Sequence, residues 1–135
     1  MVFLFADQWR AQALGHAGDV NARTPQLDRL ASQGIVLTTA VSTCPVCSPY
    51  RATLITGRYP ISHGVFVNDV CLNREAVSLA QAFANAGYRP AYIGKWHLDG
   101  PGRPSFLPPD RRQGFGFWRG WRCPHNTNRP PYLPH

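Results

Sequence analysis

The sequence predicts an α/β fold in which helices cover a mainly parallel β-sheet. Three helix-like segments, each closed by a glycine, alternate with short apolar or β-branched runs through the first 94 residues, and this alternation is typical of layered α/β domains. A hydrophobic share of 44% is enough for a packed core. In such sheets ligands gather at the carboxyl ends of the strands, so polar residues that follow a strand are candidate site residues.

The first third of the chain predicts two strands around one helix. Residues 2–6, VFLFA, form an apolar run that suits a strand buried on both faces. Thr24 is suited to cap a helix, Pro25 to its first position, and Gly34 to its end. The β-branched run at residues 35–41, IVLTTAV, predicts the second strand.

The middle of the chain repeats this plan. The segment SPYRATLIT, residues 48–56, predicts a helix with Pro49 in its first turn and Gly57 at its end. A second amphipathic segment occupies residues 77–87, and PAYIG at residues 90–94 predicts a third strand. The sheet would therefore receive helices from both sides of the sequence's glycine stops.

The last third, residues 99–135, is rich in proline, glycine, arginine and aromatic residues and has no regular period. We expect a long loop region there. Three strands do not make a well-covered doubly wound sheet, so we expect residues 1–135 to be the N-terminal part of a catalytic domain.

Composition narrows the class of partner. Of the 14 basic residues 13 are scattered arginines and Lys95 is the only lysine, giving a net charge of +7. Scattered arginine favours oxyanions such as sulfate or phosphate over a nucleic-acid surface. No segment has the length of a membrane span, and the start MVFLFAD lacks the basic leader of a signal peptide. We therefore expect neither a nucleic-acid nor a membrane partner, and a cytoplasmic location by default.

Cys47 stands where the helix at residues 48–56 begins, and the residues alone leave its role open. It can be a small buried apolar residue. With Cys44 it forms a C-x-x-C that could be redox-active, and a zinc site could add Cys71, Cys123 or His125. A helix N-terminus also favours anions through its dipole and its free N–H groups.

Four segments in order resemble the sulfatase family. Cys47-Ser48-Pro49-Tyr50-Arg51 matches the pattern C-x-P-x-R and is followed by Thr-Gly-Arg at 56–58. Residues 87–98 match G-Y-x-x-x-x-x-G-K-W-H-L, a second sulfatase signature. FADQWR at 5–10 and TPQLDRLA at 24–31 are similar to the family's first strand and first helix.

The resemblance implies a three-layer fold like that of alkaline phosphatase and sulfatases. It also implies that Cys47 is oxidised to formylglycine by a formylglycine-generating enzyme, which reads Pro49 and Arg51. The hydrated aldehyde would be the nucleophile, and Arg51 would orient it.

Further roles follow from the same resemblance. Asp7, at the end of the first strand, and residue 47 would bind Ca²⁺ or Mg²⁺, for which carboxylate oxygens are suitable ligands. Many family members carry a second acidic residue at the position of Gln8, whose role stays open. Lys95 would bridge a sulfate oxygen and the nucleophile, and His97 would hydrogen-bond the hydrated nucleophile.

Asn68 completes the candidate set as an amide donor to substrate, and we expect the distant site residues to converge at one edge of the sheet. The implied activity is hydrolysis of sulfate esters of a carbohydrate or an aryl alcohol. The alternatives are a phosphonate or phosphate monoester or diester hydrolase of the same superfamily, and a noncatalytic anion-binding fragment. Because a hard cation takes six or more oxygens, we expect residues 1–135 alone to be a poor enzyme.

Overall fold

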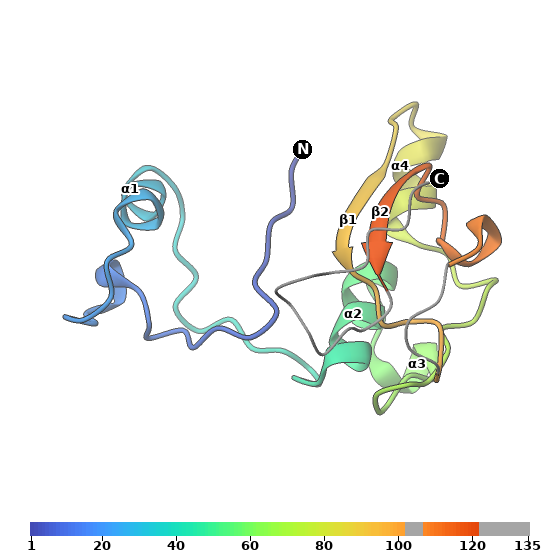
Figure 1. Cartoon of the computed structure of the whole chain (residues 1–135), viewed down its shortest axis with the longest axis horizontal. Coiled ribbons are helices and arrows are strands. Elements are labelled where there is room, and N and C mark those ends of the chain that lie inside the picture. Colours follow the sequence, from blue (N-terminus) through green and yellow to red (C-terminus); the bar gives the residue numbers. More distant parts are fainter. Residues whose placement is uncertain (102–106, 122–135) are drawn as a thin grey trace. The chain divides into compact units, whose positions relative to one another are not determined.

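A computed structural model describes residues 1–101 and 107–121 of the chain. The chain divides into two compact units, residues 1–41 and residues 42–135, whose elements are drawn in Figure 1. Within the described ranges, none of the helices has both the length and the apolar character needed to cross a bilayer.

The first unit is organised around one aspartate. A short 3-10 helix, Gly15–Ala17, precedes α1, Pro25–Gln33. Asp28 in α1 accepts hydrogen bonds from the His16 backbone N–H at 2.9 Å and from the Thr24 hydroxyl at 3.0 Å. The His16 N–H is the main reason that the pKa of Asp28 lies below its ordinary value.

The predicted helix is confirmed as α1, with Pro25 first and Gly34 directly after the end. The strands predicted at residues 2–6 and 35–41 are wrong, since no strand forms at either place. Most of their apolar side chains are exposed, including Leu4 and Ile35. A strand needs a neighbouring strand to satisfy its backbone N–H and C=O groups, and in this unit no partner strand is paired with either run.

The second unit places helices against a parallel pair of strands. Its helices are α2, Cys47–Thr56, α3, Pro60–His63, and α4, Leu79–Asn85. The strands β1, Ala91–Lys95, and β2, Phe117–Trp121, pair in parallel, and Figure 1 shows their arrowheads pointing the same way. The two predicted helices and the predicted third strand are thus confirmed, with ends shifted by a few residues.

The tail is not loop throughout, which corrects the expectation for residues 99–135. It holds a 3-10 turn at Pro109–Arg111 and the strand β2. The register places Ala91 beside Phe117 and Lys95 beside Trp121. The short aromatic run FWRGW has no repeating period of its own, so pairing with β1 decides its conformation. Residues 122–135, also in the expected loop region, lie outside the described residues.

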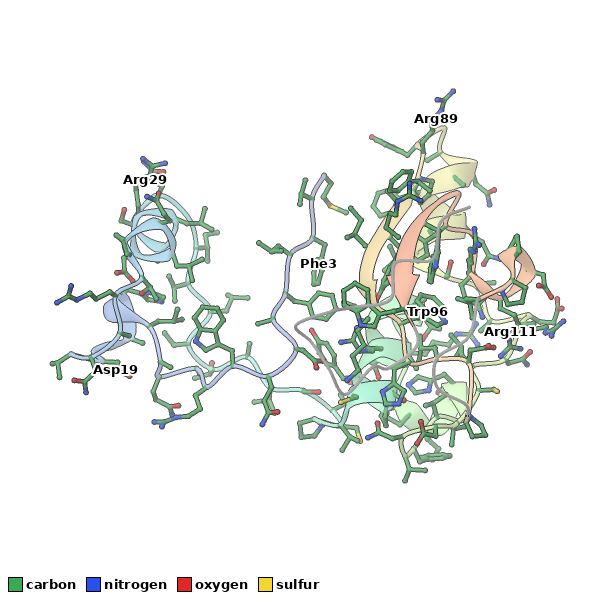
Figure 2. All side chains as sticks on the ribbon, in the orientation of Figure 1. Phe3, Asp19, Arg29, Arg89, Trp96 and Arg111 are labelled. Atoms are coloured by element: carbon green, nitrogen blue, oxygen red, sulfur yellow. The ribbon has the colours of Figure 1, made fainter. Side chains whose placement is uncertain are left out.

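Aromatic rings form the centre of the core of the second unit. Tyr92 stacks on Trp118, with ring centroids 5.0 Å apart, and meets Trp96 edge to face at 5.1 Å. Phe115 contacts both Tyr92 and Trp96. Trp96 directly follows β1 and is labelled near the arrowhead end of the strands in Figure 2. This packing fixes the end of β1, from which the candidate site is built.

Trp118→Ala is expected to lower the free energy of unfolding by about 3 to 5 kcal/mol, because it empties a large buried volume and removes the ring stacked on Tyr92. Phe117→Ala, on the neighbouring residue that is 50% exposed, is the control and should cost much less. Urea unfolding followed by circular dichroism measures both. Equal losses would show that the aromatic cluster does not carry the stability of the unit.

Candidate active site

The end of β1 meets the start of α2. Lys95 is the last residue of β1 and Cys47 the first of α2, and Figure 1 shows α2 at the arrowhead end of the strands. The Lys95 ammonium Nζ donates to the Cys47 Sγ over 3.3 Å. Both side chains are half-buried. A cation therefore lies against the side chain that stands at a helix N-terminus, where negative charge is favoured.

Arg51 ties the helix to the strand. Its side chain is buried at 4% exposure, and one guanidinium nitrogen donates to the Lys95 carbonyl and, over 3.3 Å, to the Tyr92 hydroxyl. The Tyr92 hydroxyl donates to the same Lys95 carbonyl. Arg51 is one turn along α2 from Cys47, so its positive charge and that of Lys95 are held near the same helix end.

His97 is buried beside these cations and is held at three points. Its Nε2 lies 2.9 Å from Asp69 Oδ1, and its backbone carbonyl accepts the Ser48 hydroxyl at 2.7 Å. Its backbone is left-handed, with φ of 58°. Burial is the main cause that lowers the pKa of His97; the Asp69 hydrogen bond opposes this effect and the Lys95 charge adds to it.

Asn68 also contacts the start of α2. Its side-chain oxygen accepts the Ser48 backbone N–H at 2.9 Å, so it satisfies one of the N–H groups that a helix leaves open at its first turn. The amide nitrogen of an asparagine is a donor, and its predicted contact with substrate stays a prediction. The structure thus brings Cys47, Arg51, Lys95, His97 and Asn68 into one neighbourhood.

The remaining cysteines do not form a described metal or disulfide centre. Cys44, Cys47 and Cys71 are free thiols, and Cys44 Sγ lies 4.0 Å from the Phe66 carbonyl oxygen. Within residues 1–101 and 107–121, no three His, Cys, Asp or Glu side chains group as metal ligands. Cys123 and His125, the other candidates for a zinc site, lie outside the described residues.

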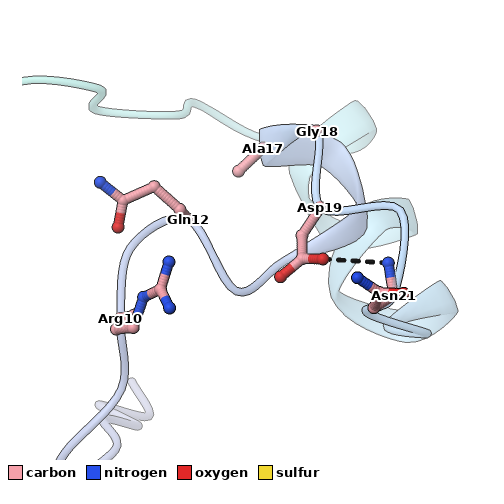
Figure 3. A pocket seen from close by; sticks show the side chains of 6 residues that line it. All are labelled: Arg10, Gln12, Ala17, Gly18, Asp19 and Asn21. Atoms are coloured by element: carbon pink, nitrogen blue, oxygen red, sulfur yellow. Dashed lines mark hydrogen bonds between the residues drawn. The ribbon is translucent and has the colours of Figure 1, made fainter.

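Asp7 and Gln8 belong to the first unit and are exposed. The predicted binding of a divalent metal by Asp7 and residue 47 stays a prediction, as does the role of Gln8. A pocket in the same unit is lined by Arg10, Gln12 and Asp19 together with Ala17, Gly18 and Asn21 (Figure 3). None of the predicted site residues lines it.

His63 is a structural residue next to α2. The Val65 backbone N–H donates to its Nδ1 at 3.1 Å, so the ring proton lies on Nε2, which is 3.1 Å from the Thr53 hydroxyl. Burial holds the pKa of His63 below its ordinary value. Its ring connects the end of α3 to α2 and has no contact with Cys47 among those that the structure describes.

Three contributors were absent from the sequence predictions. Asp69 and Tyr92 bond to His97 and Arg51, and the Ser48 hydroxyl bonds to the His97 carbonyl. Only Asp69 gave a signal, as a carboxylate next to Asn68 in a loop. Tyr92 and Ser48 sit at variable positions of the two signature patterns, so the patterns alone could not indicate them.

With this geometry established, comparison with known proteins defines the class: the chain belongs to the sulfatase family, whose family model, Sulfatase, matches residues 1–134. It is 50% identical over 132 residues to the ulvan-active sulfatase of Formosa agariphila, covering 98% of this chain and 26% of that protein. It is 34% identical over 137 residues to human arylsulfatase A, covering 97% of this chain and 26% of that protein.

Solved structures agree on the fold. The candidate sulfatase yidJ of Bacteroides fragilis matches with a TM-score of 0.81 and 36% identity, over 88% of this chain and 30% of that one. The phosphonate monoester hydrolase of Agrobacterium radiobacter matches with a TM-score of 0.65 and 32% identity, over 84% and 23%. The predicted sulfatase-like α/β fold is confirmed, and the chain spans between 23% and 30% of the length of these four proteins.

The protein should lose stability as the pH falls below about 6.5, the ordinary pKa of histidine. Folding lowers the pKa of His63 and His97, so below that pH the unfolded chain binds more protons than the folded one and unfolding is favoured. The free energy of unfolding, measured by urea titration from pH 7.5 to 5.5, should therefore fall. His63→Gln should make the slope shallower, by at most about 1.4 kcal/mol per pH unit; an unchanged slope would contradict a neutral buried His63.

Proposed function

We propose that the protein is a sulfuric ester hydrolase whose nucleophile is a formylglycine made from Cys47. The observation that carries the proposal is the 3.3 Å contact between the Lys95 ammonium and the Cys47 Sγ at the first residue of α2. In the modified protein an oxygen of the hydrated aldehyde takes the place of this sulfur. Family membership supports the proposal, because the matched residues include both signature patterns.

The side chains around residue 47 have complementary tasks. Lys95 can donate to a sulfate oxygen and to the nucleophile oxygen, which places sulfur close to the attacking atom. The fixed guanidinium of Arg51 adds positive charge where negative charge gathers during transfer. His97, neutral because it is buried, can accept a hydrogen bond from the hydrated nucleophile.

The cycle needs two hydroxyl groups on one carbon. One hydroxyl oxygen of residue 47 forms a bond to sulfur while the sulfur–oxygen bond to the alcohol breaks, and the alcohol leaves with a proton. The second hydroxyl then loses its proton, its oxygen forms the carbonyl, and the carbon–oxygen bond to sulfate breaks. Water hydrates the aldehyde again. A serine or cysteine ester would lack this internal route for release.

A divalent cation, Ca²⁺ or Mg²⁺, would neutralise charge on the nonbridging sulfate oxygens when bound. The donors proposed for it are the Asp7 carboxylate and an oxygen of residue 47, which are of the hard type these cations prefer. Lys95 and Arg51 supply positive charge from the second unit itself. A formylglycine-generating enzyme is the proposed modifying partner, and a sulfated carbohydrate or aryl ester the proposed substrate.

Hydrolysis of a phosphonate or phosphate ester is the second candidate, because the same cations would hold either tetrahedral anion. It is supported by the likeness to the Agrobacterium phosphonate monoester hydrolase. The protein made from its complete reading frame would be assayed in parallel with aryl sulfate, sulfated carbohydrate and aryl phosphonate. Faster phosphonate hydrolysis would favour the second candidate, and absence of all three activities a noncatalytic anion-binding role.

Residue 47 should carry an aldehyde when the protein is produced together with a formylglycine-generating enzyme. Mass spectrometry of the tryptic peptide that contains it should show the mass loss expected when a thiol becomes an aldehyde, and an aldehyde-reactive hydrazide should label the same peptide. The Arg51→Lys protein, which alters the C-x-P-x-R pattern, is the control and should be modified much less. An unmodified Cys47 in the unaltered protein would overturn the proposed nucleophile.

Cys47→Ala should abolish turnover, by at least about 10³-fold in kcat, because it removes the nucleophile. Cys44→Ala is the matched control: it removes the other cysteine of the C-x-x-C, and the loss should be small. Both are compared in the protein made from its complete reading frame, with circular dichroism to verify folding. Equal losses would instead favour a redox or metal role for the cysteine pair.

A further inference from the structure

We propose that Asp69 is a positioning residue for His97: its carboxylate holds the imidazole with the proton on Nε2 and leaves Nδ1 as the proton acceptor at the nucleophile. The inference rests on the proposed function for its catalytic meaning. The arrangement of the two side chains can be tested without any activity.

The direction of the hydrogen bond follows from the chemistry of the two groups. Asp69 Oδ1 lies 2.9 Å from His97 Nε2. An ionised carboxylate can only accept, so Nε2 must carry the proton and donate it. In a neutral imidazole the other nitrogen then has a lone pair and no proton, and Nδ1 becomes the basic atom of His97.

Nδ1 is the atom left over for chemistry. The His97 side chain is 5% exposed, and its Nδ1 is buried with no hydrogen-bond partner among the described residues. A buried polar atom without a partner costs free energy. The sulfatase reading explains this cost, because a hydroxyl of the hydrated residue 47 would supply the missing donor.

The backbone of both residues is shaped for this contact. Asp69 has φ of 64° and His97 has φ of 58°, a left-handed conformation that is uncommon outside glycine. Two further bonds brace the pair: the neighbouring Asn68 holds the Ser48 N–H, and the Ser48 hydroxyl holds the His97 carbonyl. The loop of Asn68 and Asp69 therefore contacts the nucleophile helix and the histidine together.

Asp69 would also act when His97 takes up a proton. If Nδ1 accepts a proton from the hydroxyl that attacks sulfur, the ring becomes a cation beside Lys95. The electrostatic attraction of Asp69 raises the pKa of His97, and that of Lys95 lowers it. The carboxylate thus stabilises the protonated ring, while burial and Lys95 make it a readier donor to the departing group.

The test uses two substitutions that suit the left-handed backbone. Asp69→Gly removes the carboxylate at a position where glycine is unstrained. Asp69→Asn keeps an accepting oxygen, and asparagine tolerates this conformation better than most residues. Asp110→Gly is the control, because it removes an exposed carboxylate that pairs with Arg74 at 2.8 Å and has no described contact with His97.

Proton and ¹⁵N NMR of the chain labelled in histidine reads the imidazole directly, with His97→Gln to assign the signal. The unaltered chain should show a downfield, slowly exchanging Nε2–H resonance of His97. That resonance should disappear in Asp69→Gly and persist in Asp69→Asn and Asp110→Gly. Its persistence in Asp69→Gly would overturn the inference, whether or not the protein hydrolyses any sulfate ester.

Kinetics of the modified protein made from its complete reading frame add the catalytic meaning. Asp69→Gly should lower kcat by about 10- to 100-fold, the usual effect of losing the partner of a site histidine, with little change in KM. Asp69→Asn should restore part of the loss, and Asp110→Gly should leave kcat unchanged. Equal kcat values for Asp69→Gly and Asp110→Gly would refute a positioning role. If the unaltered protein lacks activity, the proposed function fails and the NMR result alone decides the Asp69–His97 arrangement.

Discussion

The bond from Arg51 to the Lys95 carbonyl is the constraint on which the rest of the site depends. It fastens the second turn of α2 to the last residue of β1, and Tyr92 reinforces it through its hydroxyl. With these two ends joined, the Lys95 side chain has a short path to Cys47. A buried guanidinium is costly unless its hydrogen bonds are satisfied, so the fold and the charge of the site are stabilised by the same contact.

The aromatic core provides the rigidity that this contact needs. Tyr92 belongs both to the ring cluster and to the Arg51 network, since its ring stacks on Trp118 while its hydroxyl reaches Arg51. Trp96 lies between Lys95 and His97 in the chain and is fully buried. Its indole anchors the backbone at the middle of the triplet. Lys95 and His97 therefore leave a backbone that is fixed from both the strand and the core side.

Local patterns were sufficient for some parts of the site and not for others. Helix stops at Gly34 and Gly57 and the proline at the start of α1 act through local backbone preferences, so these helices could be predicted. The gathering of Cys47, Lys95 and His97 could be expected because strand ends and helix starts meet at one sheet edge. Asp69 could not, because its role depends on a bond to a residue 28 positions away.

By itself the sequence determined the sulfatase family, the helices, the strand β1 and the residues that gather around Cys47, because each is written in a local pattern. Tertiary structure decided the conformation of the apolar runs at residues 2–6 and 35–41 and of the aromatic run at Phe117–Trp121. A strand exists only when another strand satisfies its backbone groups. Residues 117–121 found that partner in β1, whereas the two apolar runs have none among the described residues of their unit.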